Sequence, residues 1–314
     1  MARKKGNHVH GFINFYKPVG MSSNQAVGFV RHIFDAKKAG HGGTLDPLAE
    51  GILPIALGEA TKMLSYMLTE DKYYQFEMTF GTETETDDAE GAPVHTSDLR
   101  PTEKALRAVM DSFLGEITQT PPVYSALKID GKRACDRVRA GEEVVLASRQ
   151  VTIHSINLDE FDANKATLSV HVSKGTYIRS LTKDIGRQLG CYAYVTRLIR
   201  TEVPPFKLND AITKEMLDLC AEIGQSPATH LLDVDHILAD IPVYTASDNE
   251  VQTLLTGISI DIKREKLEGQ HKANKPVRVK TEKGSMISLA EFDGQTLKPK
   301  KNFPLLNDIV NKEI

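Results

Sequence analysis

Two stretches of the chain alternate between apolar and polar positions, and each predicts a strand. In residues 72–80 every second side chain is aromatic or methionine, and the other face carries hydroxyl, amide and carboxylate groups. Leu168, Val170 and Val172 alternate with more polar neighbours before a Ser-Lys-Gly turn. Successive side chains of a strand point to opposite faces of the sheet, so both stretches are expected to be half buried.

Apolar residues at a period near 3.6 predict helices elsewhere. Either Ser22 or Ser23 can cap a helix whose apolar face covers residues 27–34, and a second stripe recurs through residues 178–189. Further helices are predicted over residues 59–68 and from about Thr102, with a short strand at residues 12–15. The chain contains more predicted strands than a succession of parallel βαβ units would have. The expected fold class is therefore α/β (α+β), with a mixed, largely antiparallel sheet and flanking helices.

Less regular stretches separate these elements. Residues 52–57 are apolar but contain Pro54, which favours an edge strand or an irregular segment. Residues 82–98 are acidic and rich in threonine, which predicts an exposed loop. Residues 204–236 are expected to be helical and connective, and after Ile241 the composition shifts to short apolar strands between glycines. We therefore predict two domains, residues 1–241 and a small β-rich domain of residues 242–314.

Length and composition indicate the number of domains, and the charge distribution bears on nucleic-acid binding. A chain of 314 residues with 40% hydrophobic composition can bury a large core and is expected to form two domains. Its net charge of −3 gives no overall signature of nucleic-acid binding. Basic residues are nevertheless in excess from Asp261 onward, and residues 174–200 contain six of them against Asp184 alone. That run is either a basic stripe or a solvated face.

Cysteine usage and hydropathy indicate the compartment. Cys135, Cys191 and Cys220 lie far apart and form no C-x-x-C pair, so neither a disulfide framework nor a zinc site is suggested. The basic start of the chain is followed by only a short apolar run, which predicts neither a signal peptide nor a membrane span. A cytoplasmic protein without membrane contacts is expected.

The densest group of chemically suggestive residues is the loop Gly40–Gly51. Three glycines in four positions allow the backbone to approach a ligand closely, and the carboxylate of Asp46 follows them as a candidate nucleophile or base. The pair Asp46-Pro47 is equally typical of a helix start, with the aspartate as N-cap and the proline at the first helical position. Spacing alone leaves both interpretations open.

A second group surrounds Arg179, which is predicted to lie in the first turn of its helix. The helix macrodipole disfavours a cation there, so an anionic partner is expected to offset the cost. A carboxylate held by a guanidinium in a partly dry site stays ionised and fixed, as a nucleophile requires. The alternative is a surface arginine that faces phosphate or solvent.

Taken together, these stretches closely resemble the TruB family of tRNA pseudouridine synthases. The resemblance runs in order from about Gly11 to Arg200 and rests on KPVGMSS, GHGGTLDPLAEGILPIALGEATK, DKYYQFEMTFGTETETDDAEG, PPVYSALKIDGKR and KGTYIRSLTKDIGRQLG. It implies that the substrate is the uridine at position 55 in the TΨC loop of tRNA. It also implies a pseudouridine synthase domain followed by a PUA RNA-binding domain, and it implies no cofactor and no metal.

The resemblance also implies roles for individual residues. It makes Asp46 the catalytic aspartate, Tyr74 the active-site tyrosine and Arg179 the partner of the aspartate. Without it, Tyr74 would be a core residue on a strand face. The expected substrate-binding residues are His41, associated with the flipped-out loop; Lys62, Tyr177 and Leu198, lining the pocket; and Lys17, within KPVGMSS.

RNA contacts outside the pocket are expected from a thumb insertion at about residues 121–145. Lys128, Lys132, Arg133, Arg137 and Arg139 supply positive charge there, whereas Cys135 stands where many relatives carry an aromatic residue. In the tail, which the resemblance covers only weakly, Lys300 and Lys301 are expected to contact phosphates.

The chemistry requires the base to leave the stack, because the C1′–N1 bond must break and C1′ must join C5. Asp46 could attack the sugar or the base, or abstract a sugar proton; Tyr74 is a candidate base for the C5 proton, although a phenol is a weak base near neutral pH. The alternatives are a noncatalytic RNA-binding or RNA-folding protein, a carboxylate-based nucleosidase, and a synthase for another RNA. A monomer is expected.

Overall fold

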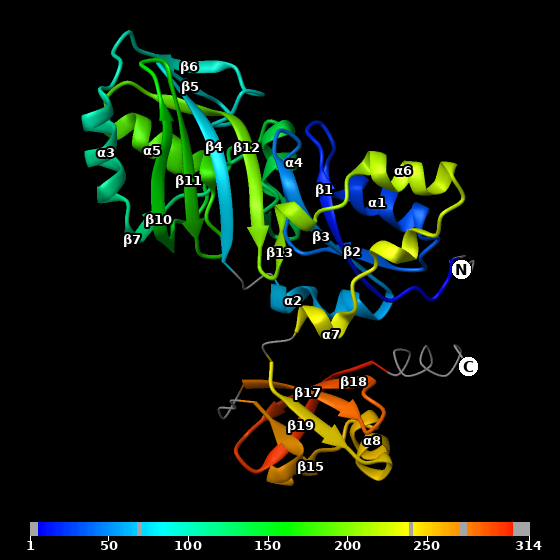
Figure 1. The fold of residues 1–314 in the computed structure, drawn as a ribbon. Helices are drawn as coiled ribbons and strands as arrows, with labels where there is room; N and C mark the ends of the chain where they lie inside the picture. Colours follow the sequence, from blue (N-terminus) through cyan, green and yellow to red (C-terminus); the bar gives the residue numbers. More distant parts are fainter. Residues whose placement is uncertain (1–5, 68–70, 239–240, 270–274, 304–314) are drawn as a thin grey trace.

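The computed structural model describes residues 6–67, 71–238, 241–269 and 275–303, which form a large sheet with helices and a smaller second sheet (Figure 1). Leu68, the last residue of one predicted helix, and residues 304–314 of the predicted second domain lie outside this part. Within it, none of the helices combines the length and the apolar character that crossing a membrane would require.

The large sheet has nine strands and is mixed, largely antiparallel, as predicted. Among its described strands, the β3–β12 pair is the one parallel contact. The order along the sheet is β1 (Gly11–Lys17), β3 (Glu50–Leu57), β12 (Ala193–Val203), β4 (Lys72–Phe80), β11 (Lys165–Val172), β10 (Arg149–Phe161) and β7 (Gly115–Gln119), with β2 (Ala39–His41) beside β3 and β13 (Phe206–Lys207) beside β12.

The helices start where the sequence supplies caps. Ser22 caps α1 (Ser23–Ile33) and forms a capping box with Gln25, and Thr102 caps α3 (Glu103–Ser112). The predicted stripe in residues 178–189 becomes α5 (Ile178–Gln188), which packs its buried leucine and isoleucine residues against the core of the sheet. The remaining helical elements of this part are η1 (Gly58–Met63), α2 (Leu64–Met67), α4 (Ala134–Arg139), η2 (Leu208–Asp210), α6 (Lys214–Glu222), η3 (Pro227–His230) and α7 (Val234–Ile237).

The strand that contains Pro54 lies inside the sheet, so the predicted edge strand or irregular segment is wrong. Pro54 falls between the residues of β3 that pair with β2 and those that pair with β12, while β1 pairs along the whole opposite side. The missing N–H therefore costs no ladder hydrogen bond.

The acidic segment 82–98 is only in part the exposed loop that its composition predicts, because residues 93–96 are exposed but several acidic side chains are buried. It forms a hairpin of β5 (Thr82–Thr84) and β6 (Pro93–Thr96), and Glu83, Asp87 and Asp88 are almost fully buried. Cations from α5 neutralise all three carboxylates. Along α5, the predicted basic run of residues 174–200 therefore pairs with buried carboxylates, whereas Lys174 and Arg197, outside the helix, are exposed.

The second sheet contains β14 (Val243–Ala246), β15 (Ile260–Asp261), β16 (Leu267–Glu268), β17 (Lys275–Thr281), β18 (Met286–Phe292) and β19 (Thr296–Asn302), with α8 (Asp248–Leu255) and η4 (Arg264–Lys266). The predicted boundary after residue 241 falls just before β14. A shared apolar cluster joins the sheet to the rest of the molecule, with Met286 and Phe303 packed among residues such as Met63 and Ile237.

Candidate active site

A cavity of about 480 Å³ opens where β4, β11 and β12 meet the loop before β3 and the start of α5. Its volume is within the range of about 300–1,000 Å³ typical of small-ligand sites. Asp46, Tyr74 and Arg179, which the sequence separates widely, all line it, as do Tyr177, Leu198 and Lys128.

Helix α1 anchors the loop that carries Asp46. The Ser23 hydroxyl accepts a hydrogen bond from the Leu45 amide at 2.8 Å and donates one to the Leu45 carbonyl at 2.9 Å. The Ala49 amide donates to the Asp46 carbonyl, which closes a turn rather than a helix. The helix-start interpretation of Asp46 is therefore wrong, and its carboxylate is left to face the cavity.

Gly51 allows the loop to end directly against the neighbouring strand. Its φ of 102° lies in the region that favours glycine, and a Cβ there would lie 2.3 Å from the Arg200 carbonyl oxygen. Arg200 itself is fully buried and donates to the carbonyls of Ile52 and Gly43. The cavity wall formed by the glycine-rich loop is thus fixed to β12.

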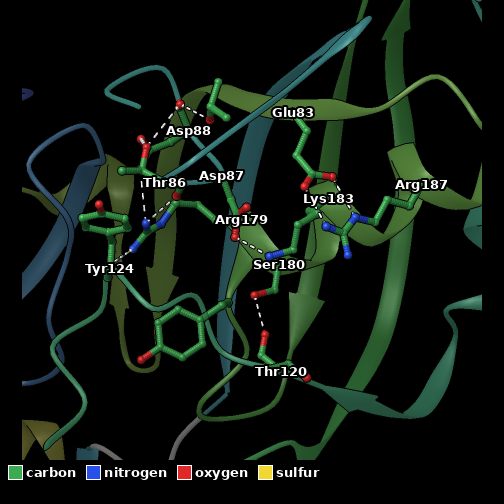
Figure 2. Close-up of polar contacts among 12 residues, drawn as sticks. Glu83, Thr86, Asp87, Asp88, Thr120, Tyr124, Arg179, Ser180, Lys183 and Arg187 are labelled. Atoms are coloured by element: carbon green, nitrogen blue, oxygen red, sulfur yellow. Dashed lines mark hydrogen bonds and ion pairs between the residues drawn. The ribbon is translucent and has the colours of Figure 1, made fainter. Parts of the chain in front are cut away.

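Arg179 lies in the first turn of α5 and has the anionic partner that its position predicts. Its Nη2 lies 2.8 Å from Asp46 Oδ2, and its Nη1 lies 3.3 Å from Asp88 Oδ2. The same two nitrogens donate to the carbonyls of Thr86 at 2.7 Å and Tyr124 at 2.9 Å (Figure 2). The Arg179 side chain is only 4% exposed, whereas that of Asp46 is 32% exposed. The guanidinium is therefore fixed, and the carboxylate remains accessible.

Two further ion pairs extend this arrangement along α5 (Figure 2). Lys183 Nζ lies 2.7 Å from Asp87 Oδ2, and Arg187 binds both carboxylate oxygens of Glu83. Burial raises the pKa of Asp87, and the Lys183 ammonium opposes that effect. The hairpin is thus attached to the helix through three carboxylates, the innermost of which shares Arg179 with Asp46.

Aromatic and apolar side chains make up the rest of the wall. Tyr74 is half-buried on β4, and Leu198 is 6% exposed on β12. Tyr177 precedes α5, where the Gln119 side chain binds both its backbone N–H and its carbonyl. The Arg149 guanidinium lies 5.0 Å from the centre of the Tyr177 ring. The cavity therefore offers flat apolar surfaces beside a charged pair.

Three predicted substrate-binding residues do not line this cavity. Lys17 is fully buried, and its Nζ donates to the carbonyls of Pro18, Met21 and Pro47, so it supports the Asp46 loop from inside. Burial lowers its pKa to about 8. His41 ends β2 just before the loop, and burial lowers its pKa.

Lys62 lies on η1, at the contact with the second sheet. Its Nζ pairs with Glu59 at 2.6 Å, donates to the Asn302 carbonyl at 2.7 Å and lies over the Phe303 ring. Lys301 donates to the Lys62 carbonyl and to Ser65 Oγ. Lys62 and Lys301 therefore contribute to the contact between the two sheets, and neither lines the cavity.

Sequence reasoning missed several residues of the site. Asp88 is 2% exposed, and Lys72 and Arg200 line the cavity while being almost fully buried. The doublet Asp87-Asp88 was visible, but it lies in a stretch whose composition predicts an exposed loop. No local pattern marks Lys72 or Arg200, because only the strand register brings each of them to the cavity.

The predicted thumb contains β8 (Lys128–Ile129), β9 (Lys132–Arg133) and α4 (Ala134–Arg139). Arg133 and Arg137 pair with Asp136 and Glu142. By contrast, the exposed cations Lys128, Lys132 and Arg139 have no ion-pair partner among the residues that the structure describes. Lys128 and Lys132 also line a second hollow that Asn24 borders.

Comparisons with known proteins define the class of this fold. Residues 31–178 match the model described as TruB family pseudouridylate synthase (N terminal domain), and residues 179–239 match tRNA pseudouridylate synthase B C-terminal domain. The solved Cbf5-Nop10-Gar1 complex contains a chain with a TM-score of 0.73 and 27% identity, covering 95% of this chain and 86% of that one. A chain of an H/ACA RNP bound to a substrate RNA containing 2'-deoxyuridine has a TM-score of 0.71, 26% identity and coverage of 93% and 84%. The fold is that of a pseudouridine synthase.

Curated relatives narrow the assignment. The tRNA pseudouridine synthase B of Zymomonas mobilis is 43% identical over 94% of this chain and 96% of its own length. That of Nitrobacter winogradskyi is 44% identical over 96% of this chain and 85% of its own length. The chain therefore belongs to the TruB family. Its second sheet, from β14 onward, lies outside both matched stretches.

Proposed function

We propose that this protein isomerises the uridine at position 55 in the TΨC loop of tRNA to pseudouridine. The observation that carries the proposal is the ion pair of Asp46 and Arg179 at 2.8 Å inside a cavity bordered by Tyr74 and Tyr177. The names of the curated relatives, which are tRNA pseudouridine synthases, support the same reaction.

The reaction exchanges two bonds without any net change in composition. The glycosidic bond from C1′ to N1 breaks, a bond from C1′ to C5 forms, and the proton lost from C5 is matched by one gained at N1. None of this can occur while the base is stacked in an RNA loop, so the uridine must be turned out into the cavity. Unstacking costs a few kcal/mol, and stacking on an aromatic ring such as Tyr74 returns about 1–3 kcal/mol.

Asp46 is the proposed catalytic residue because it is the cavity carboxylate that is both held and accessible. The Arg179 guanidinium fixes the side chain, which a nucleophile or a base requires. Tyr74 is the proposed partner that stacks on the base and lies near its C5 position. The position of the Asp46 carboxylate is compatible with three roles: attack at the sugar, attack at the base and abstraction of a sugar proton.

Recognition of the rest of the tRNA is proposed for the thumb and the second sheet. Lys128, Lys132 and Arg139 form a set of exposed cations at the thumb, suited to phosphates. We assign the second sheet to a PUA-like RNA-binding domain, and we propose that the protein acts as a cytoplasmic monomer without a cofactor.

The decisive experiment is incubation of the protein with an unmodified tRNA transcript, followed by site-resolved detection of pseudouridine. Modification at position 55 and at no other uridine is expected. Modification of ribosomal RNA instead would transfer the reaction to another substrate. Release of free uracil would indicate a nucleosidase, and binding of the transcript without any product would indicate a noncatalytic RNA-binding protein.

A further inference from the structure

Three potential metal ligands from distant parts of the chain meet on the large sheet. Asp71 directly precedes β4, His154 lies on β10 and His171 on β11. The Nε2 atoms of His154 and His171 lie 3.1 Å and 3.2 Å from the same oxygen, Asp71 Oδ2. All three ligand atoms lie within 4.8 Å of one another.

The cluster occupies the face of the sheet opposite the active-site cavity. In the register of β4 and β11, His171 lies opposite Tyr73, and Val172 lies opposite Lys72. Lys72 and Val172 line the cavity, and side chains alternate between the faces of a strand, so His171 points the other way. The cluster is therefore separate from the proposed catalytic residues although it is next to them in sequence.

We propose that Asp71, His154 and His171 bind a divalent first-row transition ion, with Zn²⁺ the best match. Two imidazole nitrogens and one carboxylate form a typical three-residue Zn²⁺ ligand set, with water as the fourth ligand. Ligands of a tetrahedral Zn²⁺ at about 2.0–2.1 Å from the metal lie about 3.3 Å apart. The observed separations of 3.1 Å and 3.2 Å are close to this spacing.

The surroundings hold the ligands in place and leave the ion a route in. The Tyr73 ring stacks on His171 with centroids 4.1 Å apart and planes 10° apart, which fixes the plane of that imidazole. The side chains of Asp71 and His154 are 39% and 37% exposed, so an ion can enter from solvent. Oxygen-preferring Mg²⁺ and Ca²⁺ fit poorly, because two of the three ligands are nitrogens.

Binding there would connect three separate segments at one end of the sheet. The ion would attach the residue that leads into β4 to both β10 and β11, beside the strand positions that carry Lys72 and Val172 into the cavity. A metal ion that binds only the folded state stabilises it by RT ln(1 + L/Kd), where L is the free metal concentration, so the melting temperature should rise with the Zn²⁺ concentration. The site requires no RNA, so its test is independent of the proposed reaction.

The test is calorimetric titration of the EDTA-treated full chain with Zn²⁺ at pH 7.5, together with thermal unfolding with and without Zn²⁺. One ion per chain and a higher melting temperature are expected. Each of D71N, H154A and H171A should weaken Zn²⁺ affinity at least about tenfold. Removing a residue that is only hydrogen-bonded to a metal ligand already weakens affinity by that factor.

Two variants serve as matched controls. His95, which stacks on Tyr192, and His230, which lies 3.6 Å from Cys220 Sγ, are histidines outside the cluster, so H95A and H230A should bind Zn²⁺ as the parent protein does. The proposal is overturned if the parent protein does not bind Zn²⁺, or if the three ligand variants retain its affinity. Destabilisation by D71N without any Zn²⁺ binding would also overturn it, and would identify a purely hydrogen-bonded cluster.

Discussion

The two ends of helix α5 make the same kind of contact for different purposes. At its start, Arg179 lies 2.8 Å from Asp46, and in its last turn Arg187 lies 2.6 Å from Glu83. The macrodipole favours the cation at the last turn and disfavours it at the first. The Arg187 side chain is 52% exposed against 4% for Arg179. Only the inner pair leaves its carboxylate more exposed than its arginine, as expected of an acid that must reach a substrate.

The largest expected effect is that of removing the charge at the inner pair. D46N should lower pseudouridine formation at least about a thousandfold, because an amide cannot serve as nucleophile or base. Affinity for tRNA should stay near that of the parent protein, since the cations on the thumb are untouched. Single-turnover assays and filter binding measure the two quantities. Product at a normal rate from D46N would remove Asp46 from its proposed role.

Removing each arginine tests the comparison directly. R179M leaves the carboxylates of Asp46 and Asp88 without their cation, and the free energy of unfolding should fall by about 3–5 kcal/mol, with a large loss of activity. R187M also leaves a buried carboxylate, that of Glu83, without its cation, but the arginine removed is half exposed and far from Asp46, so a smaller cost of about 1–3 kcal/mol is expected, with activity retained. Urea unfolding and modification assays on both variants check this. Equal losses of stability and activity in R179M and R187M would show that the two ion pairs have the same role.

A smaller effect is expected at the thumb. K128A and K132A should each weaken tRNA binding and reduce the slope of log affinity against log salt by about one. R133A is the control, because Arg133 already pairs with Asp136. An unchanged salt slope in the two lysine variants would exclude phosphate contacts at the thumb.

A last prediction concerns the pH dependence of stability at Lys17, which lies beneath the Asp46 loop. Burial lowers its pKa from 10.5 to about 8, so the folded state releases the proton before the unfolded chain does. Between about pH 8 and 10.5 the contribution of this group to stability therefore rises with pH, and below about pH 8 the cost of burying the charge is present in full. Unfolding free energies of the parent protein minus those of K17M should increase from pH 7 to pH 9.5. Parallel pH curves would contradict this.

Local patterns predicted the elements well, because each depends on its own residues. The alternation of residues 72–80 becomes β4 with the same bounds, and the dipole cost at Arg179 correctly indicated an acidic partner. Predictions from composition failed where tertiary contacts determine which side chains are buried. The acidic segment was predicted to be exposed, but Asp87 and Asp88 are buried, because cations of α5 pair with their carboxylates.

Contacts between distant residues left no sequence signal. Asp71, His154 and His171 meet only because β4, β11 and β10 are neighbours in the sheet, and a search for zinc ligands at short spacing could not find them. Lys62 was assigned to the pocket, whereas the docking of the second sheet engages it with Asn302.

The carbonyl of Tyr124, to which Arg179 donates, has a mechanical consequence. It anchors the first part of the thumb to the guanidinium that also holds Asp46, and Ser180 anchors the preceding Thr120. If the thumb moves when RNA binds, only the residues beyond Tyr124 can move without breaking the contacts that also hold Asp46.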